Sequence, residues 1–392
     1  MSPSPDPSGH LHLAVALDGT GWHPASWREP DARPAELLTA GYWTDLVGEA
    51  ERGLLDFVTI EDGLEVQSDR FRRPDQRTDR VRGRLDAVLI ASRVAPRTNH
   101  IGLVPTAIAT YTEPFHLSKA IATLDYVSSG RAGIRVQVSA RTDTAAHFGR
   151  RKVPAHSAAL AGDLLGEAAD YVEVLRRLWD SWEDDAEIRD VATGRFIDRN
   201  KLHYIDFDGA WFSVKGPSIT PRPPQGQPIV AALGHAEPAH RLIAGAADVG
   251  FITPHSASET TAIVNAISAM RADGEDPVRV FADVVVFLGE SPQAATARRE
   301  RLDELAGIEY VSDAEVFVGT PAQLADLIQD WRAAGAAGFR LRPATLPHDL
   351  RQITDGLVPE LRRRGLFRDS YQANTLRGLL GLPRPVSRYS TA

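Results

Sequence analysis

Six polar residues lie within or directly after short apolar runs, and these residues could do chemistry in this chain. They are His23, Asp62, Thr106, Gln137, Ser139 and His235. An imidazole can donate or accept a proton near neutral pH, and carboxyl, amide and hydroxyl groups can fix a ligand by hydrogen bonds. The sequence therefore predicts a polar ligand site, provided that the fold brings the ends of these runs to one face.

Several well-known catalytic motifs are absent from the sequence. None of the twelve His residues stands in an HExxH spacing, and neither a GxSxG elbow nor a phosphate-binding P-loop is present. The chain has no Cys, which excludes disulfides, thiolate metal sites and a Cys nucleophile. We therefore expect no metal site.

The composition is that of a globular protein. Of its 392 residues 43% are hydrophobic and 24% charged, and the formal net charge is -8. A negative chain is a poor ligand for nucleic acid or for an anionic membrane, so neither is expected as a partner. No secretion signal and no run of about 18 apolar residues is visible, and the expected location is the cytoplasm.

Strand-like and helix-like segments alternate along the chain. Strands are expected at Leu11–Leu17, Leu54–Ile60, His100–Ile108, Ala132–Ser139, Pro228–Leu233, Asp248–Thr253, Val278–Leu288 and Gly338–Leu341. Helices are expected at Ala35–Arg52, Leu85–Val94, Phe115–Val127, Leu164–Trp182, Pro238–Ala247, Ala257–Ala272 and Pro292–Leu305, and from Pro321 onward. Eight such units favour an α/β (β/α)8 TIM barrel. An open doubly wound sheet is the alternative, but the first loop, Asp18-Gly-Thr-Gly-Trp-His, lacks the GxGxxG spacing of that fold.

Some segments stand outside this alternation. We expect insertions at the carboxyl-terminal face of the barrel at about 141–163 and 183–227, and a tail at 365–392, within a single domain of residues 1–392. Asp208-Gly209 predicts a hairpin turn, and Thr320 with Gln323 predicts a helix start with a capping box. In barrels of this type the site lies at the carboxyl ends of the strands, where the six polar residues would meet.

Long stretches of the chain resemble one enzyme family. Thr106-Ala-Ile-Ala-Thr-Tyr-Thr-Glu-Pro-Phe-His-Leu and Ala122-Thr-Leu-Asp-Tyr-Val-Ser-Ser-Gly-Arg are similar to the bacterial luciferase-like flavin-dependent monooxygenases. The similarity is greatest to the branch of nitrilotriacetate, dibenzothiophene-sulfone and long-chain alkane monooxygenases. It runs from about His12 to Pro385.

The resemblance implies two-component chemistry. A separate NAD(P)H-dependent flavin reductase would supply reduced FMN (FMNH2), and O2 would add to the flavin C4a to give a peroxide that oxidises a small organic substrate. By the same resemblance Asp62 and Thr106 would contact the flavin ring, Ser139 would lie near the phosphate, and His23 would be the catalytic histidine. Gln137 and His235 would complete the cofactor pocket, and the protein would be a homodimer or homotetramer.

The chain departs from the family at the expected phosphate site. Leu164-Leu165 stands where the family usually has an Arg-Tyr pair, and Ile134-Arg135 stands where it usually has Trp-Asn. In Ala232-Leu-Gly-His-Ala, Ala236 occupies the position of a phosphate-binding Ser. Arg135, Arg141, Arg150 and His235 are candidates to replace the lost contacts. Two further hypotheses therefore stay open: a deazaflavin (F420)-dependent oxidoreductase of the same superfamily, and a barrel that has lost flavin binding. The sequence does not identify the substrate.

Overall fold

Eight parallel strands form a closed ring in the computed structural model, which describes residues 11–68, 70, 74–149, 151, 160–272, 274 and 276–390. In ring order they are β1 (His12–Leu17), β2 (Phe57–Ile60), β3 (Gly102–Ile108), β4 (Gly133–Gln137), β9 (Ile229–Gly234), β10 (Val249–Ile252), β11 (Arg279–Leu288) and β13 (Gly338–Pro343). The pairing of β13 with β1 closes the ring. The predicted (β/α)8 barrel is thus confirmed, with one observed strand for each of the eight predicted ones.

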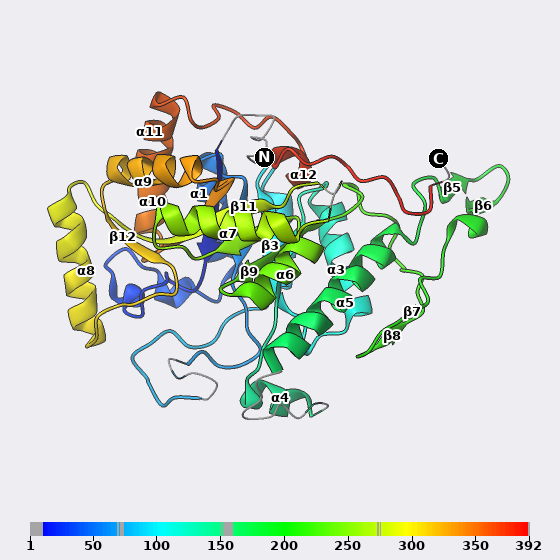
Figure 1. Ribbon diagram of the computed structural model, residues 1–392, viewed down its shortest axis with the longest axis horizontal. Coiled ribbons are helices and arrows are strands. Elements are labelled where there is room, and N and C mark those ends of the chain that lie inside the picture. Colours follow the sequence, from blue (N-terminus) through cyan, green and yellow to red (C-terminus); the bar gives the residue numbers. More distant parts are fainter. Residues whose placement is uncertain are drawn as a thin grey trace.

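Helices surround this ring (Figure 1). They are α1 (Ala40–Arg52), α2 (Ala87–Val94), α3 (Pro114–Val127), α4 (Thr142–Phe148), α5 (Leu160–Asp180), α6 (Glu237–Ala246), α7 (Ala257–Met270), α8 (Pro292–Ala306), α9 (Pro321–Ala333), α10 (His348–Gln352), α11 (Val358–Arg363) and α12 (Leu376–Leu379). Single 3-10 turns lie at Ser26–Arg28, Pro34–Glu36, Ala95–Arg97 and Arg199–Lys201, and a π turn lies at Ile353–Leu357. The predicted capping box of Thr320 and Gln323 begins α9.

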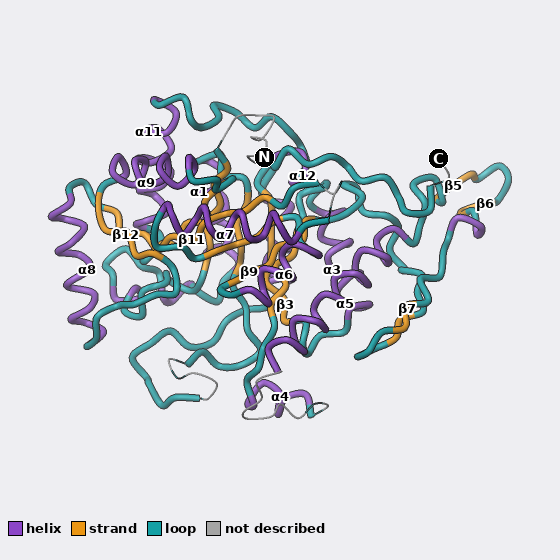
Figure 2. The backbone as a smooth tube through the Cα atoms, in the orientation of Figure 1, coloured by secondary structure: helices purple, strands orange, loops and turns teal. Residues whose placement is uncertain are grey.

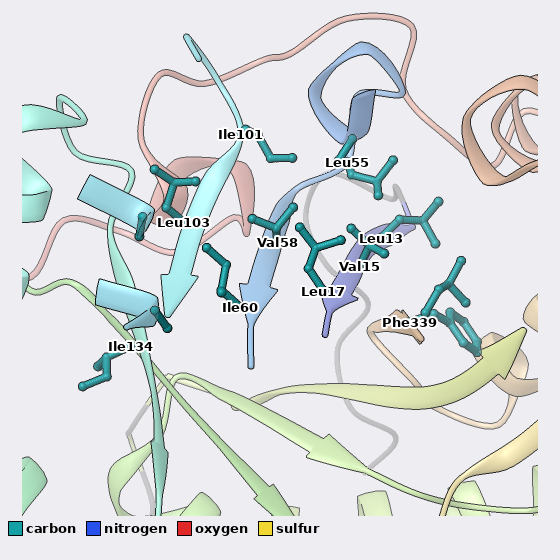
Figure 3. Packing of buried hydrophobic residues seen from close by; sticks show 14 of the residues in the cluster. Leu13, Val15, Leu17, Leu55, Val58, Ile60, Ile101, Leu103, Ile134 and Phe339 are labelled. Carbon is teal, nitrogen blue, oxygen red and sulfur yellow. The ribbon is translucent and has the colours of Figure 1, made fainter. Parts of the chain in front are cut away.

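Alternate residues of each barrel strand face opposite sides. Leu13, Val15 and Leu17 of β1 face the helices and pack in the main core (Figure 3). Residues of the other parity, such as Ala14 and Phe57, pack inside the barrel. Because both faces of the strands are covered, β1 to β3 are buried along their whole length. Only side chains that face inward at the carboxyl ends can reach a ligand in the barrel mouth.

The structure corrects several expected elements. The helix predicted at Ala35–Arg52 is divided, because the Thr39 hydroxyl accepts the Tyr42 backbone N–H at 3.3 Å and starts α1 at Ala40. The predicted hairpin exists as β7 (Phe207–Asp208) and β8 (Ser213–Val214), but its loop comprises residues 209–212 instead of Asp208-Gly209. A second hairpin, β5 (Glu187–Asp190) with β6 (Arg195–Ile197), was not predicted.

One further strand lies outside the ring. β12 (Glu315–Gly319) pairs with the last five residues of β11, which is ten residues long and extends beyond the barrel. The two hairpins pair only within themselves and project from one side of the molecule (Figure 1). The described part of the loop that follows β2 (61–68, 70 and 74–86) lies at the same end of the molecule as α4 in the shared orientation of Figures 1 and 2.

The carboxyl-terminal tail covers the amino-terminal end of the barrel. Leu376, Leu380 and Leu382 pack in one buried cluster with inward-facing residues such as Phe57 and Phe281. A Cβ on Gly102 would lie 2.5 Å from the Leu376 Cδ1, so this close approach requires glycine. The tail therefore closes one end of the barrel and leaves the other end for a ligand.

None of the helices within the described ranges combines the length and the apolar character that a membrane crossing requires.

Candidate active site at the barrel mouth

A cavity of about 570 Å³ opens at the carboxyl end of β4. Its walls come from three segments: the residues that follow β4, the first turns of α5, and the loop after β2. The lining residues are Glu65, Ser68, Arg70, Gln137, Val138, Ser139, Ala140, Arg141, Ala161, Leu164 and Leu165. Cavities of this size and placement are typical of cofactor and substrate sites in α/β barrels.

β4 carries a line of polar side chains toward this cavity. Ile134 and Val136 pack outward in the main core, so Arg135 and Gln137 face inward, and Ser139 continues the same parity. Arg135 is 4% exposed, whereas Gln137 and Ser139 lie at the cavity wall. The predicted residues Gln137 and Ser139 thus line one cavity together.

Thr106 lies deeper in the barrel, opposite Arg135 on the neighbouring strand. Its hydroxyl accepts a hydrogen bond from the Arg135 Nε at 2.9 Å, and the residue is 1% exposed. The Ser139 backbone N–H donates to the Thr110 hydroxyl at 3.0 Å, and the Ser139 hydroxyl accepts the Arg141 backbone N–H at 3.4 Å, while Ser139 lines the cavity. Thr106 is therefore joined to the site through Arg135.

A network of buried charges fills the barrel below the mouth. Arg135 pairs with Glu61, which also accepts from Arg340 Nη1 at 3.3 Å. Asp283 accepts from Arg340 Nε at 2.8 Å and from Arg342 Nε at 2.9 Å. The Arg340 guanidinium also lies 4.0 Å from the centroid of the Phe251 ring. These interactions join β2, β4, β10, β11 and β13 across the barrel interior.

Burial and pairing shift the pKa values of the network. Burial lowers the pKa of Arg135 to about 10. Burial alone would raise the pKa of Asp283, but the attraction of Arg340 and Arg342 is larger and holds this pKa below its ordinary value. At neutral pH Arg135 and Asp283 are therefore charged, and the network forms a polar layer under the cavity.

Asp62 follows Glu61 at the end of β2, and its carboxylate is held by the backbone. It accepts the Gly63 N–H at 2.7 Å and the Ala87 N–H at 2.8 Å, at the start of α2. Burial raises the pKa of Asp62. Asp62 thus connects the loop after β2 to α2, and its contact with a flavin stays a prediction.

His23 does not line the cavity of Gln137 and Ser139. Its Nδ1 accepts the Ala25 backbone N–H at 3.1 Å, so the ring proton sits on Nε2, which donates to Asp303 at 3.0 Å. The side chain is fully buried beside Phe287 and Tyr310, and burial lowers its pKa. In this conformation both ring nitrogens are occupied, and a catalytic role for His23 stays a prediction.

His235 lies elsewhere on the mouth, after β9. Its side chain is 53% exposed, its Nδ1 is 3.1 Å from the Thr253 hydroxyl, and its Nε2 is 3.7 Å from Asp313. Asp313 in turn pairs with Arg342 of the buried network at 2.6 Å. His235 is thus connected to the barrel interior but does not line the cavity of Gln137 and Ser139.

The residues proposed to replace the missing phosphate contacts occupy different places. Arg141 lines the cavity with Leu164 and Leu165, and its Nε pairs with Asp143 at 3.0 Å. Arg135 is buried below the cavity, and Arg150 lies outside the described residues. Arg141 is therefore the cationic candidate that the geometry places at the cavity wall.

Sequence reasoning missed Asp283, the acidic partner of the buried Arg340 and Arg342. Asp283 is the single charged residue in the interior of a strongly apolar strand, and a charge in such a place requires a buried partner. That signal was available in the sequence. Among the described residues, no group of three His, Cys, Asp or Glu side chains is placed to hold a metal ion.

Comparisons with known proteins agree with this architecture. A family model described as luciferase-like monooxygenase matches residues 22–338. N-acetyl-S-(2-succino)cysteine monooxygenase of Bacillus subtilis (strain 168) is 32% identical over 97% of this chain and 98% of that protein. Nitrilotriacetate monooxygenase component A of Aminobacter aminovorans is 30% identical over 96% of this chain and 97% of that protein.

A solved structure shares the whole architecture. EDTA monooxygenase from Chelativorans sp. BNC1 gives a TM-score of 0.82 at 25% identity, covering 96% of this chain and 99% of that chain. The resemblance that the sequence motifs indicated is thus confirmed over nearly the full length. The chain belongs to the luciferase-like monooxygenase family.

Proposed function

We propose that this chain is the oxygenating component of a two-component, FMN-dependent monooxygenase. It would bind FMNH2 made by a separate NAD(P)H-dependent flavin reductase and use O2 to oxidise a small organic substrate. One oxygen atom would enter the substrate and the other would leave as water, with two electrons from the reduced flavin. The observation that carries this proposal is the cavity at the carboxyl end of β4 in a chain of this family.

The cavity fits a flavin by its size and by its lining. A volume of about 570 Å³ lies within the range of cofactor sites. Gln137, Ser139 and Arg141 supply hydrogen-bond donors for carbonyl and phosphate oxygens, and Leu164 and Leu165 supply apolar surface for a planar ring. The bound reduced flavin would supply the electrons and the site of oxygen activation.

The site residues would then have the following roles. Arg141 and Ser139 would bind the phosphate in place of the usual Arg-Tyr pair, and Asp62 and Thr106 would lie toward the ring. His23 is retained as the proposed proton donor; it could serve only if the Asp303 carboxylate and the Ala25 N–H release its ring. Exclusion of water by the apolar side of the cavity would favour substrate oxidation over release of hydrogen peroxide.

Two partners belong to this proposal. The relative from Aminobacter is named component A, which supports a separate component in its own system. A reductase that delivers FMNH2 by diffusion is therefore proposed here. We also propose a homodimer or homotetramer, which light scattering on the eluting protein would measure.

An anaerobic titration with photoreduced FMN tests the proposal. Quenching of tryptophan fluorescence reports binding, and mixing with oxygenated buffer reports the rate of flavin reoxidation and the yield of hydrogen peroxide. Saturable binding, with a peroxide yield that falls when a substrate from a panel is added, would support the monooxygenase. Binding of reduced F420 in place of FMNH2 would support the deazaflavin hypothesis, and binding of neither would support a barrel without a flavin.

A further inference from the structure

The side-chain amide of Gln137 is held in one orientation. The Arg135 Nη2 donates to the Gln137 Oε1 at 2.8 Å. A guanidinium has only N–H donors, so the amide oxygen must face Arg135 and the amide nitrogen must point away from it. This assignment follows from the chemistry of the pair and not from the placement of the two similar amide atoms.

The Arg135 guanidinium is itself fixed. Its Nε donates to the Thr106 hydroxyl at 2.9 Å, and its Nη2 also pairs with Glu61. The residue is only 4% exposed, so solvent does not compete for these hydrogen bonds. Arg135 therefore acts as a rigid support for the amide one step nearer the cavity.

The Gln137 NH2 group makes no hydrogen bond to any residue that the structure describes, although Gln137 lines the cavity. A half-buried amide donor at a cavity wall is satisfied by water or by a ligand acceptor. The neighbouring Ser139 hydroxyl and Arg141 guanidinium are also donors. The wall at the end of β4 thus presents donors to whatever binds beside it.

We propose that the Gln137 Nε2 donates a hydrogen bond to an oxygen of the bound flavin, and that Arg135 is a positioning residue that fixes the polarity of this amide. The inference rests on the proposed function. It names the side-chain NH2 of Gln137 as the group that contacts the cofactor, with the amide oxygen turned toward Arg135. The flavin oxygen could be a ring carbonyl or a phosphate oxygen. Riboflavin, which lacks the phosphate, separates these two sources.

The test measures the dissociation constants of oxidised FMN and riboflavin, and the visible absorption spectrum of each bound flavin. Gln137→Met removes the donor at similar volume, and Gln293→Met on the exposed surface of α8 is the matched control. We expect Gln137→Met to weaken binding about 3- to 10-fold, the usual effect of one hydrogen bond, and Gln293→Met to leave it unchanged. If Gln137→Met weakens the binding of both flavins, the hydrogen bond goes to a ring carbonyl. If it weakens the binding of FMN alone, the hydrogen bond goes to the phosphate.

The positioning role of Arg135 needs a second comparison. Arg135→Lys keeps the charge beside Glu61 but removes the forked donor, so the Gln137 amide becomes free to turn. We expect Arg135→Lys to weaken flavin binding and shift the bound-flavin spectrum in the wild-type background, and to do neither in the Gln137→Met background. Equal weakening in both backgrounds would show that Arg135 acts independently of Gln137 and would overturn its positioning role.

The outcomes separate this inference from the proposed function. If the wild-type chain binds neither flavin, the proposed function fails and the inference falls with it. If the wild-type chain binds FMN and Gln137→Met binds both flavins with unchanged affinity and spectrum, the proposed function stands and the inference is wrong. Thermal unfolding of each variant confirms that the comparison is made between folded proteins.

Discussion

Replacing Asp283 by Asn is expected to destabilise the barrel strongly. Asp283 is fully buried and accepts four hydrogen bonds, two from Arg340 and two from Arg342. Asn has nearly the same shape, but it has no charge, and its amide nitrogen would face guanidinium donors. The substitution therefore leaves two buried cations without their shared carboxylate.

The size of the effect follows from this environment. Removing one partner of a buried ion pair lowers the free energy of unfolding by roughly 3–5 kcal/mol. Glu61 and Asp313 still pair with Arg340 and Arg342, so the loss is expected at the lower end of this range. Asp313, which also pairs with Arg342, has a side chain that is 43% exposed. Water can replace that carboxylate, so Asp313→Asn is expected to lower the free energy of unfolding by less than about 1 kcal/mol.

The effect should also depend on pH in a defined direction. Because the folded pKa of Asp283 lies below its unfolded value, its stabilisation is complete above about pH 4 and is lost as the pH falls through the folded pKa. Urea unfolding, followed by tryptophan fluorescence, measures the free energy of unfolding. The wild type and both variants are compared at pH 7 and at pH 3. A loss below about 1 kcal/mol for Asp283→Asn at pH 7, or a difference that grows at pH 3, would refute the reasoning.

Three further substitutions test the site. His23→Ala is expected to lower the free energy of unfolding by about 2–3 kcal/mol, because Asp303 loses one of its hydrogen-bond donors and the fully buried ring leaves a cavity; wild-type turnover per folded molecule would then exclude His23 as proton donor. Asp62→Ala is expected to weaken binding of FMNH2 at least about tenfold if its carboxylate contacts the ring, and equal affinity in an anaerobic titration would end that assignment. Arg141→Met is expected to weaken the binding of FMN about tenfold and to leave the binding of riboflavin nearly unchanged. An equal loss of affinity for both ligands would place the phosphate elsewhere.

The barrel could be predicted from the sequence because each of its strands is a short apolar run between polar loops. β12 could not, since Glu315–Gly319 is only half buried and forms only because β11 extends beyond the barrel and offers it an edge. The divided helix at Thr39 was missed for a similar reason, because the apolar spacing continues across the break while one hydroxyl decides where the helix starts.

The site was predicted less completely than the fold. Gln137 and Ser139 share a cavity because they share a strand face, and strand parity can be deduced from sequence. The pairing of Arg135 with Glu61 depends on which strands are neighbours in the closed ring, and spacing does not give that. His23 follows the first strand as expected, but its loop folds back so that the ring packs against α8 instead of facing the mouth.

The tail that covers the amino-terminal end of the barrel is synthesised after all eight barrel strands. When the last barrel strand, β13, has left the ribosome, all eight strands exist, but Phe57 and Phe281 still lack their cover from Leu376. The roughly 33 residues between Pro343 and Leu376 take about 2–7 s to translate at ~5–20 residues per second. During this interval Phe57 and Phe281 lack their cover at the amino-terminal end of the nascent barrel.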